Sequence, residues 1–131
     1  MNRHILVIED DKDILEVLKD LLESEGYRVS TAENGQEAIE FLTSTPTLPG
    51  LVLVDLMMPV MDGFQFREAQ KVHPRLQHLP VVVMSADGHI EQKKERIGVS
   101  VFLKKPLDLD VVLNTIGTHY QSPSEKSVPT N

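Results

Sequence analysis

The sequence predicts an α/β fold in which helices cover both faces of a five-stranded parallel sheet. Continuous apolar runs, such as residues 51–54, are typical of strands that are buried on both sides. Five strand segments alternate with segments of helical spacing, and right-handed crossovers then place helices on each face. The chain has 131 residues, 40% of them hydrophobic, which is enough for one domain with a buried core.

The first predicted strand is residues 5–8, and a helix follows it. Apolar residues recur three and four positions apart in the segment after this strand. Asp13 is placed like an N-cap with Glu16 as its N3 acid, and Gly26 is placed to close the helix. We therefore expect the helix to begin after Asp13.

A second strand, a second helix and a third strand come next. Residues 28–32 have a strand-like pattern whose polarity predicts a position at the edge of the sheet. Asn34 precedes a segment of helical spacing and is expected to cap it. The segment 43–50 is rich in helix-breaking residues, so it should return the chain to the third strand at residues 51–54.

The second half of the chain continues the alternation. The pattern predicts a helix over 64–72, a strand over 81–85, a short helix over 90–96 and a strand over 101–103. Asp108 is then placed to cap a final helix. These elements complete five strands and five helices.

Composition restricts the classes of function. The net charge of -7 and a pI near 5.1 argue against direct binding to nucleic acid or to an anionic membrane, because both need a basic face. The chain has no cysteine and no apolar stretch of membrane-spanning length. We expect a soluble cytoplasmic protein with one domain over residues 1–120 and a disordered tail over 121–131.

Polar side chains stand where the predicted strands end. Glu9 and Asp10 follow the first strand, Asp55 ends the third, Ser85 ends the fourth and Lys105 follows the fifth. The carboxyl ends of parallel strands meet at one edge of the sheet, which is where such folds bind ligands. We therefore expect these five residues to meet at one site.

The residue types at this edge indicate phosphoryl chemistry. Glu9, Asp10 and Asp55 form an oxygen-rich set that suits Mg²⁺, for which Mn²⁺ could substitute. Their mutual repulsion requires a cation, and Lys105 supplies an ammonium. Asp55 could then act as a nucleophile toward a phosphoryl group, with Lys105 neutralising its oxygens and Ser85 donating a hydrogen bond.

Over residues 3–120 the sequence resembles the receiver domains of two-component response regulators, of the stand-alone, single-domain type. Five matching groups occur in the order typical of that family. They are Glu9-Asp10, Asp55 with Met58-Pro59 and Met61-Asp62-Gly63, Ser85-Ala86, Phe102, and Lys105-Pro106.

The resemblance implies a flavodoxin-like sheet of strand order 2-1-3-4-5 and phosphotransfer to Asp55 that depends on Mg²⁺. The donor would be a histidine kinase or a histidine phosphotransfer protein. The main-chain carbonyl of Met57 would be a further metal ligand. Ser85 and Phe102 would form a switch pair, in which the hydroxyl moves to the phosphoryl group and the ring turns inward.

A switch of this kind would act on a protein partner. The fourth helix, fifth strand and fifth helix would form a face whose affinity for a downstream target changes on phosphorylation. We expect signalling by noncovalent docking, without direct contact to nucleic acid and without membrane insertion. The domain would not be an enzyme in the ordinary sense, because it would catalyse only its own phosphorylation and dephosphorylation.

Two other functions are consistent with parts of this pattern. One is a receiver-like module that docks constitutively without phosphorylation. The other is a metal-dependent phosphatase, but that class ordinarily needs a second acid two residues after the nucleophile, where this chain has Met57.

Each residue also has a purely structural interpretation. The Glu9-Asp10 pair could be a solvated turn, Asp55 a capping acid and Ser85 a turn residue. Phe102 could be an ordinary core aromatic. Lys104 and Lys105 could be a solvated pair, and Lys105 is preferred for the site because Pro106 holds the preceding residue extended.

Overall fold

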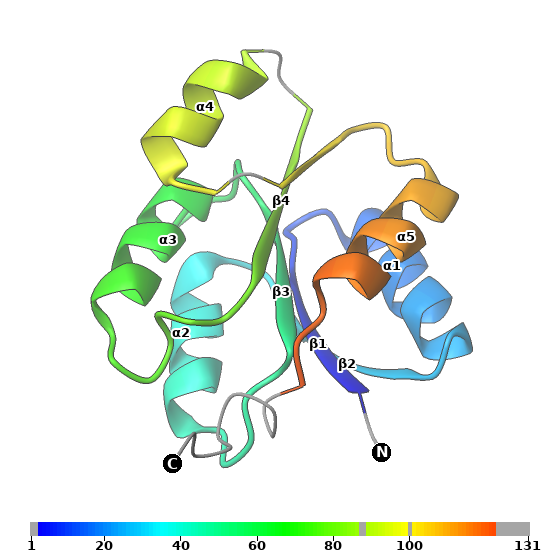
Figure 1. Cartoon of the computed structure of the whole chain (residues 1–131), viewed down its shortest axis with the longest axis horizontal. Helices are drawn as coiled ribbons and strands as arrows, with labels where there is room; N and C mark the ends of the chain where they lie inside the picture. The colour runs from blue at the N-terminus through cyan, green and yellow to red at the C-terminus, as the bar shows by residue number, and fades with distance from the viewer. Residues whose placement is uncertain (1–2, 87–88, 100, 123–131) are drawn as a thin grey trace.

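The computed structural model describes residues 3–86, 89–99 and 101–122, and within them the chain forms one parallel five-stranded sheet (Figure 1). The strand order is β2-β1-β3-β4-β5, and all four neighbouring pairs are parallel. This confirms the predicted fold class and places the polar second strand at an edge. The strands are β1 (Arg3–Ile8), β2 (Tyr27–Ala32), β3 (Leu51–Asp55), β4 (Val81–Ser85) and β5 (Phe102–Lys104).

Five helices pack on the two faces of this sheet. In Figure 1, α2 and α3 lie on one side of the strands, and α1 and α5 lie on the other. α4 lies beyond α3, next to the end of β4. The helices are α1 (Lys12–Ser24), α2 (Gly35–Ser44), α3 (Gly63–Val72), α4 (Ile90–Ile97) and α5 (Leu109–His119).

Alternate residues of the strands build two separate cores. In β1, Leu6 and Ile8 belong to the core on the side of α2 and α3, whereas Ile5 and Val7 belong to the core with α1 and α5. This alternation follows from the two-residue period of a strand. Each fully buried aliphatic side chain stabilises the fold by about 1.5–3 kcal/mol relative to an exposed one. The central strands therefore form a rigid support for the residues at their ends.

The cap of α1 differs from the prediction. Asp11, not Asp13, is the N-cap, and its side-chain oxygen accepts hydrogen bonds from the backbone N–H of Asp13 (3.0 Å) and Ile14 (3.2 Å). An N-cap residue has an extended backbone just before the helix, and Asp11 has that conformation, whereas Asp13 lies inside the first turn. Asn34 and Asp108 cap α2 and α5 as predicted.

Other element bounds shift by one or two residues, and β1 begins at Arg3, two residues before the predicted start. β2 begins at Tyr27, β5 covers Phe102–Lys104, and α4 ends at Ile97. Of the predicted disordered tail, residues 121 and 122 are described, and the backbone N–H of Gln121 donates to the carbonyl of Gly50 (3.1 Å). Residues 123–131 lie outside the described part of the chain, so the rest of that prediction is not tested.

Candidate functional site

The parallel arrangement of β1 and β3 brings three acids to one edge of the sheet. Ile8 is paired with Val54, so Glu9 and Asp55 follow at the same level of neighbouring strands. Glu9, Asp10 and Asp55 each offer a carboxylate oxygen, and these oxygens all lie within 4.8 Å of one another. Glu9 is only 1% exposed, which contradicts the interpretation of Glu9-Asp10 as a solvated turn.

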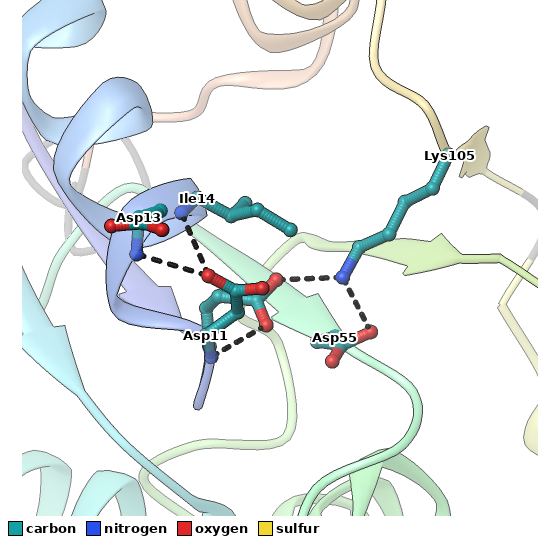
Figure 2. A network of polar contacts seen from close by, with 6 residues as sticks. Asp11, Asp13, Ile14, Asp55 and Lys105 are labelled. Carbon is teal, nitrogen blue, oxygen red and sulfur yellow. Dashed lines mark hydrogen bonds and ion pairs between the residues drawn. The ribbon is translucent and has the colours of Figure 1, made fainter.

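Lys105 reaches the same place from the end of β5. Its Nζ lies 2.9 Å from Glu9 Oε1 and 3.3 Å from Asp55 Oδ1, so one ammonium contacts both acids (Figure 2). The side chain of Lys105 is 14% exposed, whereas Lys104 is exposed. The backbone N–H of Lys105 donates to the carbonyl of Ser85 (2.9 Å), which ties this segment to β4. The predicted meeting of these acids and the lysine is therefore observed.

The electrostatics of the pocket follow from burial and like charge. Burial raises the pKa of Glu9 to about 7, and the negative charge of Asp55 adds to this rise against the opposing hydrogen bond from Lys105. For Lys105, burial by itself lowers the pKa, but its hydrogen bond with Glu9 and the charge of Asp55 outweigh burial and raise it. Lys105 therefore stays cationic. The acids together carry more negative charge than one ammonium neutralises.

Glu9 is held at both of its carboxylate oxygens. Its Oε2 accepts a hydrogen bond from the backbone N–H of Asp11 (3.1 Å), while Oε1 contacts Lys105. Asp11 itself caps α1, so Figure 2 shows one continuous network from the first turn of that helix to Asp55. Glu9 is thus held between the first turn of α1 and Lys105.

The loop after Asp55 is held close to the sheet. The N–H of Leu56 donates to the carbonyl of Met84 (2.9 Å), and the N–H of Gly63 donates to the carbonyl of Leu56 (2.8 Å). A Cβ atom at Gly63 would lie 2.9 Å from Leu56 Cα and 3.0 Å from Asp55 O, so α3 begins where only glycine fits. Val60 in this loop has φ +68°, a conformation that is costly for a β-branched residue.

Of the remaining residues singled out from the sequence, Ser85 and Met57 lie at this edge, and Phe102 begins β5 at the level of Val83. Ser85 is 1% exposed at the end of β4, and its Oγ accepts a hydrogen bond from Lys93 Nζ (3.3 Å). Phe102 is half-buried and packs against the core on the side of α2 and α3. Met57 follows Asp55 by two residues, and its side chain is 65% exposed.

The sequence reasoning did not single out Lys93. In sequence it is one of several charged residues in α4, and nothing in its spacing distinguishes it from Lys94. Only the position of α4 over the end of β4 brings its ammonium to Ser85.

The acidic cluster fits a hard divalent cation. Three carboxylates within reach of one another, two of them buried, supply the oxygen ligands that Mg²⁺ prefers. The surplus of negative charge in the pocket favours such an ion.

The comparisons with known proteins agree with this geometry. The family model described as "Response regulator receiver domain" matches residues 5–117. The chain belongs to the response regulator receiver family. Receiver domains are phosphoryl-accepting signalling modules that interact with histidine kinases or phosphotransfer proteins and with downstream targets. They bind Mg²⁺ at an acidic pocket, and a constitutive module without phosphorylation is not favoured for this receiver.

Individual relatives differ in length. Sporulation initiation phosphotransferase F of Bacillus subtilis is 30% identical over 118 residues, which cover 88% of this receiver and 92% of that protein. Transcriptional regulatory protein GlrR of Escherichia coli is 40% identical over 116 residues, which cover 86% of this chain but 25% of the relative. The receiver thus spans about a quarter of the length of GlrR and of several other curated relatives.

Solved structures show the same fold. A putative response regulator from Chloroflexus aurantiacus matches with a TM-score of 0.82 and 26% identity, over 90% of this receiver and 97% of that chain. Chemotaxis response regulator CheY4 of Vibrio cholerae matches with a TM-score of 0.81 and 25% identity, over 90% and 98% of the two chains. Among the residues that the receiver's structure describes, no helix is long and apolar enough to cross a membrane.

Proposed function

We propose that this receiver accepts a phosphoryl group on Asp55 from a phosphohistidine of a histidine kinase or a histidine phosphotransfer protein. The observation that carries the proposal is the contact of one partly buried ammonium, Lys105 Nζ, with both Asp55 (3.3 Å) and Glu9 (2.9 Å). A lysine that pairs with the Asp55 carboxylate can neutralise charge that arrives on it.

In the proposed reaction a carboxylate oxygen of Asp55 attacks the phosphorus of the phosphohistidine. A P–O bond forms and the P–N bond breaks, and its electron pair goes to the imidazole nitrogen, which takes up a proton as it leaves. The unprotonated carboxylate is the nucleophile, and the ammonium of Lys105 lies 3.3 Å from its Oδ1.

The charge on the transferred group is shared among several partners. Glu9, Asp10, Asp55 and the main-chain carbonyl of Met57 would hold Mg²⁺, or Mn²⁺ in its place, which when bound neutralises phosphoryl oxygens. Lys105 is placed to pair with another of these oxygens. Hydrolysis of the acyl phosphate in the same pocket would return Asp55 to its starting state. The domain would thus catalyse only its own phosphorylation and dephosphorylation.

Phosphorylation would change a docking face through Ser85 and Phe102. The phosphoryl group carries about two negative charges and strong acceptor oxygens, so it attracts the Ser85 hydroxyl. Phe102 is half-buried beside the core, and its ring would turn inward when that hydroxyl moves. The face of α4, β5 and α5 would then change its affinity for a downstream protein.

The test is phosphorylation by a small donor. The protein is incubated with acetyl phosphate and Mg²⁺, and its intact mass is measured. The wild type and an Asp20→Asn variant, altered on an exposed position of α1, should each gain one phosphoryl group. Asp55→Asn should gain none. A wild-type protein without this gain, or an Asp55→Asn variant that retains it, contradicts the proposal.

A further inference from the structure

Lys93 connects α4 to the reacting edge of the sheet. Its Nζ lies 3.3 Å from the Oγ of Ser85, the hydroxyl at the end of β4. A lysine ammonium has three donors and no acceptor, so Lys93 donates and Ser85 accepts. Ser85 is almost completely buried and Lys93 is half-buried, so the contact is partly screened from water.

The other end of α4 is fastened to α3. Arg67 of α3 donates from Nε to the carbonyl of Ile97 (3.3 Å) and from Nη2 to the carbonyl of Gly98 (3.1 Å). The guanidinium of Arg96 lies 3.7 Å from the centre of the Phe64 ring. The helix is thus held at its carboxyl end by α3, while Lys93 reaches from its middle to the site.

We propose that Lys93 is a positioning residue for Ser85 and the connection through which phosphorylation of Asp55 acts on α4. This inference rests on the proposed function of Asp55.

The direction of the hydrogen bond supports a positioning role. Because the Oγ of Ser85 accepts from Lys93, the hydroxyl hydrogen points away from the ammonium. A charged donor also polarises the hydroxyl and makes it a stronger donor to a further acceptor. Ser85 follows Met84, which is paired with Asp55 on the neighbouring strand. The ammonium therefore prepares Ser85 to donate to a phosphoryl oxygen on Asp55.

The same contact links the charge of the phosphoryl group to α4. A phosphoryl group brings about two negative charges to the end of β3. These charges attract both the hydroxyl of Ser85 and the ammonium of Lys93 behind it. The middle of α4 is then drawn toward the site, while Arg67 keeps its carboxyl end on α3. The helix changes position or order as a result.

The experiment compares Lys93→Met with two other variants. Lys93→Arg keeps a charged donor, and Lys71→Met removes the same charge from an exposed lysine of α3. Two quantities are measured on the full chain: the rate of phosphorylation by acetyl phosphate, and amide hydrogen exchange in α4 with and without beryllofluoride. Lys93→Met should slow phosphorylation by about threefold to tenfold, the effect of one weakened charge-assisted hydrogen bond.

The exchange measurement separates positioning from a merely structural role. Beryllofluoride should change exchange in α4 of the wild type, of Lys93→Arg and of Lys71→Met, and leave it unchanged in Lys93→Met. Equal rates and equal α4 responses in wild type and Lys93→Met would overturn the inference while leaving Asp55 as the acceptor. Absence of phosphorylation in the wild type would instead overturn the proposed function.

A double-mutant cycle covers the case in which Lys93→Met loosens α4 before phosphorylation. Ser85→Ala and Lys93→Met are measured alone and together. Coupled residues give a double variant that is slowed by less than the product of the two single effects. Effects that multiply would show that Lys93 does not act through Ser85, and the inference would be wrong.

Discussion

The two ends of the sheet differ in how their buried polar groups are paired. At the amino end, buried polar groups are matched in pairs: the backbone N–H of His4 donates to Tyr120 Oη (2.9 Å), and His4 Nε2 lies 2.7 Å from Ser30 Oγ. At the carboxyl end, Glu9 and Asp55 share one ammonium and repel each other. Stabilising contacts are therefore concentrated at the amino end of the strands, and reactive charge at the carboxyl end.

The amino end is also tightly packed. The rings of Tyr27 and Tyr120 lie 5.7 Å apart, and the guanidinium of Arg3 lies 4.1 Å from the centre of the Tyr27 ring. Gly50 accepts and donates backbone hydrogen bonds with Gln121 and His4. The segment after α5 is thereby held against the start of β1 and β3.

The largest effect on phosphorylation is expected for Lys105→Met, at the carboxyl end of the strands where Glu9 and Asp55 lie (the charged end). Removal of the ammonium leaves Asp55 without its cation, and phosphorylation by acetyl phosphate should slow by about 100-fold or more. Lys104→Met removes the same charge from the exposed neighbouring residue and should react like the wild type. Rates are measured well below the melting temperature of each variant. An equal loss in both variants would assign the effect to net charge.

Magnesium should stabilise the charged end. An ion that binds only the native acidic pocket raises the free energy of unfolding, by about 2.7 kcal/mol at 100 times its Kd. Thermal unfolding is measured across a magnesium titration for the wild type and for Asp10→Asn. The wild type should melt at rising temperature with magnesium, and Asp10→Asn should respond less. A melting temperature that does not change across the magnesium titration would contradict the proposed ion site.

At the amino end of the strands, Gly50→Ala should destabilise the fold without changing the phosphorylation of Asp55. A Cβ atom at Gly50 would clash with the Tyr120 ring and with the carbonyl of Gln121. Overpacking of this kind costs about 1–3 kcal/mol, which urea unfolding would measure. Gly117→Ala is the control, because a Cβ there meets nothing within 4 Å. Equal unfolding midpoints for the two variants would show that this contact relaxes freely.

Val60→Gly should stabilise the loop beside the charged end. Val60 is 77% exposed with φ +68°, and an L-residue in that conformation costs about 1–3 kcal/mol. Glycine removes this strain and loses about 0.5–1 kcal/mol through the entropy of the unfolded chain. A net gain of about 1 kcal/mol is expected in urea unfolding. Val60→Ala keeps a side chain at positive φ and should gain less, and a loss of stability in Val60→Gly would contradict the prediction.

The smallest effect is the pH dependence that His4, at the amino end of the strands, gives to the free energy of unfolding. Burial, with a contribution from the charge of Arg28, lowers the pKa of His4. The Nδ1 atom faces Arg28 Nη2 (3.3 Å), which only donates, so Nε2 carries the proton and donates to Ser30. Below about pH 6.5 the unfolded chain binds a proton that the native His4 binds only at lower pH.

The contribution of His4 to the free energy of unfolding therefore falls as pH drops from about 7.5 through 6.5, and this loss is complete below the pKa of the native His4. The raised pKa of Glu9 acts in the opposite direction, so the contribution of His4 is the difference between the wild type and His4→Gln. Unfolding by urea is measured for both proteins at about pH 7.5 and below about pH 6.5. The variant keeps a donor near Ser30 but cannot titrate, so the drop in pH should be less unfavourable to it than to the wild type. An equal change in both proteins would assign the pH dependence to other groups.

Much of the fold and the site was predictable because the signals are local. The two-residue and helical periods predicted all five strands and all five helices to within about two residues, since each element buries one repeating face. Acids, a hydroxyl and a lysine directly after apolar runs also predicted the pocket, because the ends of parallel strands must converge.

By itself, then, the sequence determined the α/β class, the alternation of elements and the meeting of Glu9, Asp55 and Lys105. Tertiary structure alone decided that Asp11 caps α1, that Lys93 rather than Lys94 contacts Ser85, and that Tyr120 returns to His4 from 116 residues away. The physical reason is that periodicity and capping act over a few residues. Contacts between distant segments depend on how helices pack on the sheet, which no short pattern encodes.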